Sequence, residues 1–232
     1  MRLALVGHGK MSRAIAQLAA ERGHVVATVI EARENRGGEA LTAERLQGVD
    51  LAFEFTRPDA AAENLLRLAR LGLRVVAGTT GWLDRLPEVS RMVREHGGAL
   101  LFSPNFSPGV HLFLRAARDL ARWFEGRSGY DGFVLESHHA AKRDAPSGTA
   151  VALRSALRRG DPGREFPVTS VRGGHVPGTH TVVYDAPFET IRLEHETRSR
   201  QVFAAGALQA GEWLQGRTGV YTFEQMLFGE EP

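Results

Sequence analysis

Residues 136–150, ESHHAAKRDAPSGTA, gather groups that can transfer protons and bind anions. His138 and His139 are adjacent, and Lys142 follows shortly after. An imidazole can deliver a proton near neutral pH, while an ammonium group attracts carboxylates and phosphates. On an extended segment the two histidines point to opposite sides. We therefore expect different roles for them, with one donating a proton and the other holding a substrate oxygen.

Lysine is rare in this chain. The 29 Lys and Arg residues include only two lysines, Lys10 and Lys142, and all the others are arginines. Lysine is a compact, titratable point charge, whereas arginine is a rigid, permanently charged fork. We therefore expect a chemical role for the ammonium group at these two positions.

The second half of the segment predicts a helix start with room for an anion. Ser147, Gly148 and Thr149 follow Pro146 at the beginning of a predicted helix over about 148–159. Free backbone amides, two hydroxyls and a glycine that permits close approach together form a cradle for a carboxylate or a phosphate. A simpler interpretation is a plain helix cap beside packed histidines. It accounts for each residue separately but not for their combination.

The remaining histidines do not indicate a metal site. His175, His180 and His195 occur further along the chain, but no recognisable ligand spacing such as HExxH joins them. We therefore predict that the protein holds no metal ion. Three others are interpreted as structural or surface residues: His24, His96 and His111.

A glycine-rich turn, VGHGKMS, follows a predicted strand over 2–7 and opens a predicted helix over 10–22. The pattern Gly7-x-Gly9-x-x-Ser12 approximates the dinucleotide fingerprint. There the first glycine permits a tight turn, and the second lets the backbone approach a pyrophosphate at the helix start. Serine at the third position is a mild departure. An ordinary glycine turn is the alternative, but the flanking strand and helix favour nucleotide binding.

Charged residues near this turn suggest how a nucleotide would be held. His8 would line the turn, and Lys10 could reach a phosphate. Glu31 ends the next predicted strand, where an acidic residue binds ribose hydroxyls. Arg33 and Arg36 could hold a 2′-phosphate instead, although for Arg36 a solvated loop charge is the simpler interpretation. The choice between NADH and NADPH therefore stays open.

Small polar residues and glycines follow three further predicted strands. They read Phe55-Thr56-Arg57, Gly78-Thr79-Thr80-Gly81 and Ser103-Pro104-Asn105-Phe106. Ligands of open parallel sheets gather outside the carboxyl ends of the strands. We therefore expect a nicotinamide and its ribose to lie near these residues.

The elements that would position these residues alternate regularly over the first hundred positions. Predicted strands cover 2–7, 24–30, 50–55, 73–78 and 99–103, and predicted helices cover 10–22, 59–71 and 87–96. This alternation predicts a doubly wound α/β fold of Rossmann type, with a parallel sheet between two layers of helices.

The pattern changes after residue 104. Helices are predicted over 108–124 and 148–159, and strands over 130–137, 167–172, 180–185 and 188–195. Successive strands without helices between them are typical of an antiparallel or mixed sheet. The helical pattern then resumes over 201–214 and 220–228. We therefore predict a dinucleotide-binding domain of residues 1–106 and 207–232, and an inserted α+β substrate domain of residues 107–206.

The composition argues against several classes of protein. No run of about 18 apolar residues occurs, so we expect no membrane span. The formal net charge is +2, and arginines are spread among acidic residues without a dense basic block, so we expect no nucleic-acid partner. The absence of cysteine rules out disulfides and thiolate metal sites and fits a cytoplasmic location.

The segment ESHHAAKRDAPSGTA resembles the pattern E-x-H-H-x-x-K-x-D-x-P-S-G-T-A of the 4-hydroxy-tetrahydrodipicolinate reductases, also called dihydrodipicolinate reductases, of lysine and diaminopimelate synthesis. GHGKM, EFTRP, GTTG, SPNFSPGV and VRGGHVPGTHTV extend the resemblance over nearly the whole chain. It implies a homotetrameric enzyme with a Rossmann domain and an inserted substrate domain. Such an enzyme uses NADH or NADPH to reduce a cyclic, unsaturated dicarboxylate imine.

The same resemblance implies roles for individual residues. His138 would be the proton donor, and Lys142 its partner and a carboxylate anchor; which of the two delivers the proton directly stays open. The substrate would be bound by His139, Ser147, Gly148 and Thr149. The cofactor would be held by Gly7, His8, Gly9, Lys10, Met11, Glu31, Gly78, Thr79, Thr80, Ser103, Pro104, Asn105 and Phe106.

Two other functions are compatible with the predicted first domain. A related dehydrogenase of a small amino acid, such as an aspartate or homoserine dehydrogenase, would share that domain but would not require the His-His-x-x-Lys pattern. A non-catalytic nucleotide-sensing module would explain the glycine turn. It gives no reason for an acid, an amine and an anion cradle in one segment.

Overall fold

The computed structural model describes residues 1–229, which form two compact units. One unit consists of residues 1–106 together with the chain from Gln201 onward, and the other of residues 107–200. The chain returns to the first unit earlier than the expected boundary after residue 206. The reason is that α6 (Gln201–Trp213) runs without a break from Gln201. None of the helices within residues 1–229 is long and apolar enough to cross a membrane.

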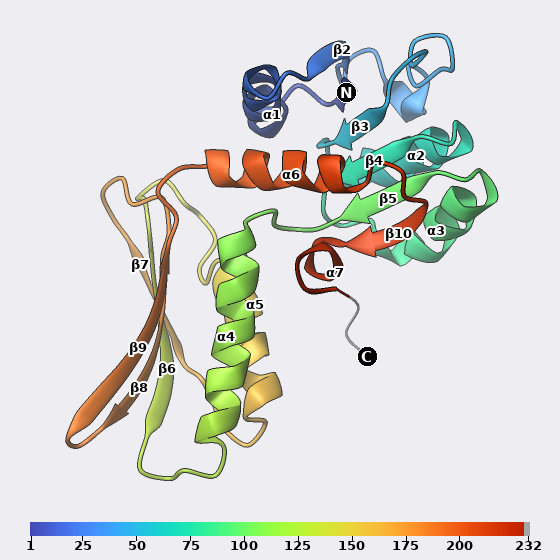
Figure 1. Cartoon of the computed structure of the whole chain (residues 1–232). Coiled ribbons are helices and arrows are strands. Elements are labelled where there is room, and N and C mark those ends of the chain that lie inside the picture. Colours follow the sequence, from blue (N-terminus) through green and yellow to red (C-terminus); the bar gives the residue numbers. More distant parts are fainter. Residues whose placement is uncertain (230–232) are drawn as a thin grey trace. The chain divides into compact units, whose positions relative to one another are not determined.

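The first unit is built on a six-stranded parallel sheet in the order β10-β5-β4-β3-β1-β2 (Figure 1). Its strands are β1 (Arg2–Val6), β2 (Val25–Ile30), β3 (Leu51–Glu54), β4 (Arg74–Ala77), β5 (Ala99–Phe102) and β10 (Gly219–Thr222). The strand order reverses at β1, which pairs with both β2 and β3. Such a reversal opens a crevice at the carboxyl ends of the strands. The predicted Rossmann-type α/β fold is confirmed.

Strand β10 corrects the sequence prediction, which continued a helical pattern over residues 220–228. Residues 219–222 instead pair in parallel with β5, and Tyr221 lies opposite Leu101. The final helix, α7 (Phe223–Phe228), begins only after Thr222, whose hydroxyl accepts a hydrogen bond from the Gln225 amide. Four residues carry little periodicity of their own, and this strand is fixed by a partner far earlier in the sequence.

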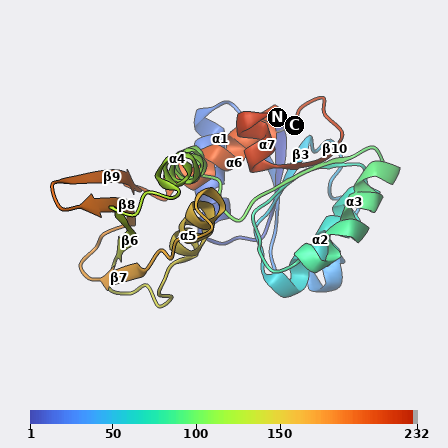
Figure 2. The same ribbon diagram turned by 90° about the horizontal axis from the view of Figure 1, so that it is seen from below.

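Helices cover both faces of this sheet. Helices α2 (Pro58–Arg70) and α3 (Leu86–Glu95) share one hydrophobic cluster with the sheet, while α1 (Lys10–Glu21), α6 and α7 share the other (Figure 2). Two short 3-10 helices, η1 (Arg36–Gly38) and η2 (Leu83–Arg85), lie in connecting segments. Neighbouring residues alternate between the clusters, so that Val75 belongs to the first and Val76 to the second. Burial on both faces explains the continuous apolar runs of these strands.

The second unit packs two helices against one face of a mixed four-stranded sheet (Figure 2). Its elements are α4 (Pro108–Phe124), β6 (Asp131–His138), α5 (Gly148–Gly160), β7 (Val168–Arg172), β8 (Thr179–Ala186) and β9 (Glu189–Glu196). β6 pairs in parallel with β7 and antiparallel with β8, and β8 pairs antiparallel with β9. The mixed sheet agrees with the prediction for this part of the chain.

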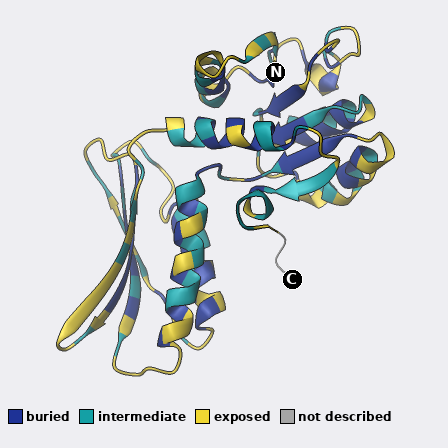
Figure 3. Ribbon diagram, in the orientation of Figure 1, coloured by how far each residue is buried: buried dark blue, intermediate teal, exposed yellow. Residues whose placement is uncertain are grey.

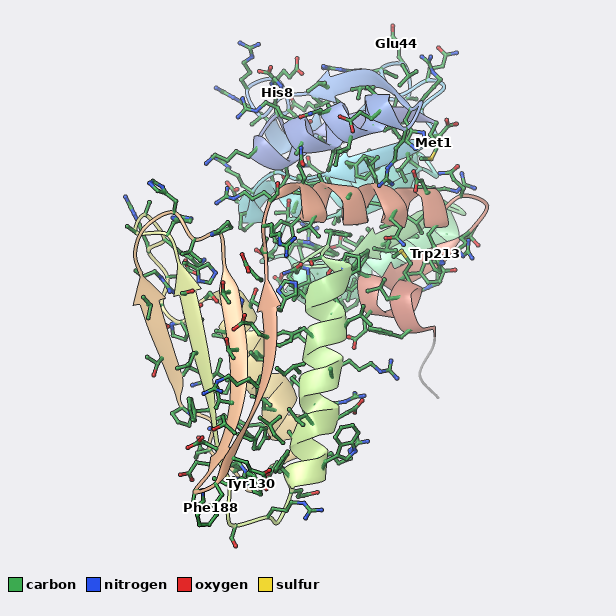
Figure 4. All side chains as sticks on the ribbon, turned by 60° about the vertical axis from the view of Figure 1, so that its left-hand side comes forward. Met1, His8, Glu44, Tyr130, Phe188 and Trp213 are labelled. Carbon is green, nitrogen blue, oxygen red and sulfur yellow. The ribbon has the colours of Figure 1, made fainter. Side chains whose placement is uncertain are left out.

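Buried and exposed residues alternate along β6, and β9 is mostly exposed (Figure 3). Val134 and Val182 point toward the helices and are fully buried with Phe113 of α4 and Leu153 of α5. The opposite face exposes apolar side chains, including Leu135 and Val171. The β8–β9 hairpin ends at Phe188, which is fully exposed at the same end of the unit as Tyr130 (Figure 4).

Candidate active site

The glycine turn joins β1 to α1 at the carboxyl edge of the parallel sheet. Gly7 has a φ of +96°, and a β-carbon at this position would overlap the Phe55 carbonyl oxygen, so only glycine fits here. The Gly7 amide donates to the Ile30 carbonyl at 2.8 Å, which holds the turn against β2. Gly9 caps α1, and open space lies where its side chain would be. A ligand can therefore approach the backbone where the helix amides begin.

A pocket of about 690 Å³ lies beside this turn and is formed entirely by residues of the first unit. Its volume falls within the range of small-molecule sites. Residues that the sequence predicts to lie near the cofactor line it: Gly7, His8, Gly9, Glu31, Arg33, Arg36, Phe55, Thr56 and Arg57. His8 projects from the turn near the surface of this unit (Figure 4). Several other lining residues belong to no recognisable sequence motif, including Asn35, Gly38, Asp59, Glu63 and Asn64.

Acidic and basic side chains meet in this pocket. Nδ1 of His8 lies 3.2 Å from Oε1 of Glu31, and Nε of Arg33 lies 2.9 Å from Oε2 of the same carboxylate. The Arg33 side chain is 83% exposed, so this ion pair contributes little to stability. Arg36 lines the same pocket. A carboxylate suited to ribose hydroxyls and two guanidinium groups suited to a phosphate therefore border one cavity.

A buried polar network supports the pocket wall. Glu54, at the end of β3, is fully buried and accepts hydrogen bonds from the Thr56 hydroxyl and from Nδ2 of Asn64. Asn35 in turn donates to Oδ1 of Asn64 at 2.9 Å. Burial raises the pKa of Glu54, and these hydrogen bonds only partly offset it. The network ties the loop after β2 and helix α2 to the sheet edge.

The other predicted cofactor residues lie at the carboxyl edge of the same sheet but do not line this pocket. They are Lys10, Met11, Gly78, Thr79, Thr80, Ser103, Pro104, Asn105 and Phe106. A β-carbon on Gly78 would overlap the Phe55 ring, so only glycine fits at this position. Oγ1 of Thr79 accepts a hydrogen bond from the Thr56 amide at 2.8 Å. This bond joins the ends of neighbouring strands β3 and β4.

In the second unit, β6 places Glu136 and His138 on its inward face. Both residues are buried, whereas His139, just after the strand, is partly exposed. The two adjacent histidines therefore have different surroundings. The Gly173 amide donates to the His138 carbonyl at 3.0 Å, which fixes the end of the strand beside β7.

The Glu136 carboxylate is held by three donors on one oxygen. Oε1 accepts from the Ser147 amide at 3.0 Å, from the Ser170 hydroxyl at 2.6 Å and from Nη2 of Arg172 at 2.7 Å. Burial opposes ionisation, but these hydrogen bonds outweigh it and lower the pKa of Glu136 to about 2. Glu136 is therefore a buried, permanently ionised carboxylate at working pH.

Two imidazoles lie beside the second oxygen of this carboxylate. Nδ1 of His138 is 3.1 Å from Oε2, and Nε2 of His180 is 3.6 Å from it. The two rings meet edge to face, with 5.1 Å between their centroids. Burial lowers the pKa of His138, although Glu136 opposes the shift, and burial with the charge of His138 lowers the pKa of His180 to about 4. Both imidazoles are therefore mainly neutral at pH 7.

The same three residues are spaced so that they could hold a metal ion. Their ligand atoms, from Glu136, His138 and His180, lie within 4.8 Å of one another. The sequence predicts no metal site, and no ligand spacing along the chain joins His180 to the other two residues. The guanidinium of Arg172 already supplies positive charge to the carboxylate at 2.7 Å. We therefore assign no metal to this cluster, and the absence of a metal ion stays a prediction.

The loop after β6 carries Lys142 and leads into α5. Nζ of Lys142 lies 2.8 Å from a carboxylate oxygen of Asp144. Ser147 is buried, and its hydroxyl caps α5 by accepting from the Ala150 amide at 3.2 Å. That hydroxyl also lies 3.0 Å from Nε2 of His180. Ser147 thus belongs to the buried network, whereas Gly148 and Thr149 remain accessible at the helix start.

The partners that complete this network were not predicted from the sequence. Ser170 and Arg172 come from β7 and His180 from β8, and strand register alone brings them opposite Glu136 and His138. One signal was available: polar residues at alternate positions of VTSVR, the sequence of β7, would face the same side as the β6 pair. The pairing itself was not visible in the sequence.

These features define a class of protein. The Rossmann-type sheet carries a glycine turn and a pocket at its carboxyl edge, which are the features of dinucleotide binding. The second unit supplies a buried histidine–carboxylate pair near an accessible lysine loop, which suits acid–base chemistry. Together they indicate a nicotinamide-dependent oxidoreductase.

Comparison with known families identifies the particular one. Residues 1–106 match the family described as "Dihydrodipicolinate reductase, N-terminus", and residues 109–227 match "Dihydrodipicolinate reductase, C-terminus". The chain belongs to the dihydrodipicolinate reductase family, whose members are NAD(P)H-dependent oxidoreductases of lysine and diaminopimelate biosynthesis. The resemblance noted in the sequence is thereby confirmed, and so is the predicted class of enzyme.

Individual relatives agree with this assignment. The chain is 32% identical to the 4-hydroxy-tetrahydrodipicolinate reductase of Christiangramia forsetii, with 98% of each protein covered. It is 39% identical to that of Methanopyrus kandleri, over 78% of this chain and 72% of the relative. A dipicolinate-bound dihydrodipicolinate reductase from Paenisporosarcina sp. TG-14 has the same fold, with a TM-score of 0.79 at 21% identity over 97% of this chain and 99% of that one.

The fold is also shared with other dehydrogenases. An aspartate dehydrogenase from Thermotoga maritima is similar with a TM-score of 0.51 and 11% identity, over 94% of this chain and 97% of that one. Likeness at that level concerns the fold alone. The family match, in contrast, covers both units of the chain and includes the His-His-x-x-Lys segment.

Proposed function

We propose that this chain reduces 4-hydroxy-tetrahydrodipicolinate to tetrahydrodipicolinate with NADH or NADPH, and that His138 supplies the proton. Family membership supports the reaction. The observation that carries the residue assignment is the buried contact of 3.1 Å between Nδ1 of His138 and the ionised carboxylate of Glu136. A carboxylate beside one ring nitrogen leaves the other nitrogen to exchange protons.

The chemistry requires a proton donor and two anion-binding groups. The bound nicotinamide supplies the hydride. Loss of the 4-hydroxyl group as water gives the conjugated imine. Hydride addition to this imine leaves electron density that must accept a proton, and His138 provides it. Lys142 attracts one substrate carboxylate, while the accessible amides of Gly148 and Thr149 hold an anion at the start of α5. His139, partly exposed beside them, can hold a substrate oxygen.

The pocket of the first unit fits the adenosine half of a dinucleotide. Gly7 cannot carry a side chain, and Gly9 leaves open space at the helix start, so the backbone there can receive a pyrophosphate. Glu31 would bind the ribose hydroxyls of NADH, and Arg33 and Arg36 would hold the 2′-phosphate of NADPH. We propose that either nucleotide is used.

We also propose that the enzyme is a cytoplasmic homotetramer that assembles through the second unit. Leu135 is 41% and Val171 56% exposed, on the face of the mixed sheet opposite the helices. Apolar side chains that gather on an open sheet face favour contact with another subunit. The exposed Phe188 at the hairpin tip extends the apolar character of this unit.

Substitution of His138 tests the proposed function. We expect His138→Ala to lower kcat by about 10²–10⁴, the usual contribution of a positioned general acid, with a smaller change in KM. The assay follows nicotinamide oxidation with enzymatically generated substrate. His175→Ala, at an exposed histidine, is the matched control and should retain activity. Full activity of His138→Ala, or no reduction by the unmodified chain, would refute the assignment.

A further inference from the structure

The two oxygens of Glu136 have different surroundings. Oε1 is saturated by the Ser147 amide, the Ser170 hydroxyl and Arg172. Oε2 and Nδ1 of His138 are both buried, and within residues 1–229 neither atom forms a hydrogen bond. They lie 3.1 Å apart. The anchored oxygen therefore fixes the carboxylate so that its free oxygen faces the His138 ring.

The opposite edge of the His138 ring faces a glycine. A β-carbon on Gly178 would lie 2.9 Å from Nε2 of His138 and 3.1 Å from its Cδ2. Any larger residue at this position would press on that nitrogen. The ring thus lies between the Glu136 carboxylate at Nδ1 and the Gly178 backbone at Nε2.

We propose that Glu136 is a positioning residue for His138: the negative charge on Oε2, 3.1 Å from Nδ1, favours hydrogen on that nitrogen, so that the proton reaches the substrate from Nε2. The inference rests on the proposed role of His138 as the proton donor. Its basis is the one-sided anchoring of the carboxylate and the glycine at the other edge of the ring. Glu136 itself does not touch the substrate.

The proton transfer balances without a further reactant. Protonated His138 carries hydrogen on both ring nitrogens. The Nε2–H bond breaks as a C–H bond forms with the electron pair that hydride addition leaves on the substrate. The imidazole remains neutral with its Nδ1–H toward Glu136, and a solvent proton then restores Nε2–H.

Charged groups face His138 from every strand packed against it. Glu136 lies on its own strand, Arg172 on β7 and His180 on β8, and Lys142 and Asp144 lie in the following loop. Burial, Lys142 and Arg172 lower the pKa of His138, and Glu136 and Asp144 raise it. His195 of β9 acts on His180. A dicarboxylate substrate adds negative charge and so favours the protonated ring.

Histidine NMR on the whole protein tests this inference separately from catalysis. In ¹⁵N-labelled protein without substrate, neutral His138 should carry its hydrogen on Nδ1, with the assignment made by comparison with His138→Gln. Glu136→Gln should lower the pKa of His138 further and lower kcat on the order of 10²-fold, with KM changed less. Glu136→Asp keeps the charge and should give intermediate values.

The controls separate positioning from folding and from the proposed reaction. Glu165→Gln makes the same change at an exposed acid of this unit and should alter neither readout. Circular dichroism reports whether each variant is folded. If Glu136→Gln does not fold, the tautomer of His138 in the unmodified protein still tests the proposal. An Nε2–H tautomer there, or an unchanged kcat and His138 pKa in folded Glu136→Gln, would overturn the proposal. If the chain does not reduce the substrate, the proposed function fails while the NMR result stands.

Discussion

At the scale of single residues, Lys142 carries a compact ammonium group at the end of a long side chain. It pairs with Asp144 at 2.8 Å, and its side chain is only 24% exposed, so it sits in a confined part of the loop after β6. The ammonium also lowers the pKa of His138. A guanidinium is bulkier and planar and does not release its proton in the working range of pH.

We therefore expect Lys142→Arg to be nearly as damaging as Lys142→Ala, although it preserves the charge. The arginine should still attract a dicarboxylate but hold it in the wrong place, so kcat should fall in both variants. Steady-state kinetics of the two variants beside His138→Ala measure this, and nucleotide affinity serves as the control because Gly7 and Gly9 are untouched. Near-full activity of Lys142→Arg would show that the site requires only a positive charge at this position and not an ammonium group.

Residues close in sequence were predictable at this scale, and their distant partners were not. The segment containing His138 and Lys142 predicts acid–base chemistry from residue types alone. Arg172 and His180 enter the site because β7 and β8 pair with β6 in a particular register. That register depends on packing of the whole sheet against α4 and α5, which no local pattern encodes.

At the scale of elements, pairing of β6 with β8 places an imidazole in a buried position. Burial lowers the pKa of His180 to about 4, from 6.5 in an exposed imidazole. Between these values the unfolded chain binds a proton that the folded chain does not, so the free energy of unfolding falls as the pH falls through this window. The lowered pKa of His138 acts in the same direction. The lowered pKa of Glu136 adds a further loss of unfolding free energy only as the pH falls below the ordinary pKa of 4.5 toward about 2.

We expect His180 to contribute up to about 3 kcal/mol to the loss of unfolding free energy between about pH 6.5 and 4. Denaturant unfolding across this range measures the slope. In His180→Gln the slope should be shallower, because the titrating group is gone, even if the variant is less stable at neutral pH. His175→Gln removes an exposed histidine and should leave the slope unchanged. Equal slopes in the unmodified protein and His180→Gln would contradict the expectation.

Elements with a clear periodicity of apolar residues were predicted from the sequence. Elements that depend on pairing or packing with distant segments were not. Helix α4 and the strand β6 carry clear apolar periodicity, and both lie where the sequence places them. Strand β10 has only four residues and depends on β5 for its pairing. The Glu54 network was also missed, because a buried acid at the end of a strand looks like any solvated residue until Asn64 of α2 is placed beside it.

At the scale of the whole molecule, the proposed function assigns nucleotide binding to the first unit and proton transfer to the second. The lining of the proposed nucleotide pocket comes entirely from residues before 107, whereas the histidine–carboxylate network lies entirely within residues 107–200. Nucleotide affinity and proton transfer should therefore respond to different substitutions. Variants of His138 or Glu136 become controls for nucleotide binding, and variants of the pocket become controls for proton transfer.

The nucleotide pocket predicts binding of both NADH and NADPH. If Glu31 binds the ribose hydroxyls and Arg33 and Arg36 accept a phosphate, as proposed, the affinities should differ by less than about a thousandfold, roughly 4 kcal/mol. Glu31→Gln removes charge repulsion against a 2′-phosphate and should move the preference toward NADPH on the order of tenfold. Arg33→Ala with Arg36→Ala should move it toward NADH. Calorimetric titration of each nucleotide measures the ratio, with His138→Ala as the variant in which it should not change. Binding of neither nucleotide would refute the proposed nucleotide site. A ratio of affinities that both substitutions leave unchanged would show that the ribose does not lie beside Glu31.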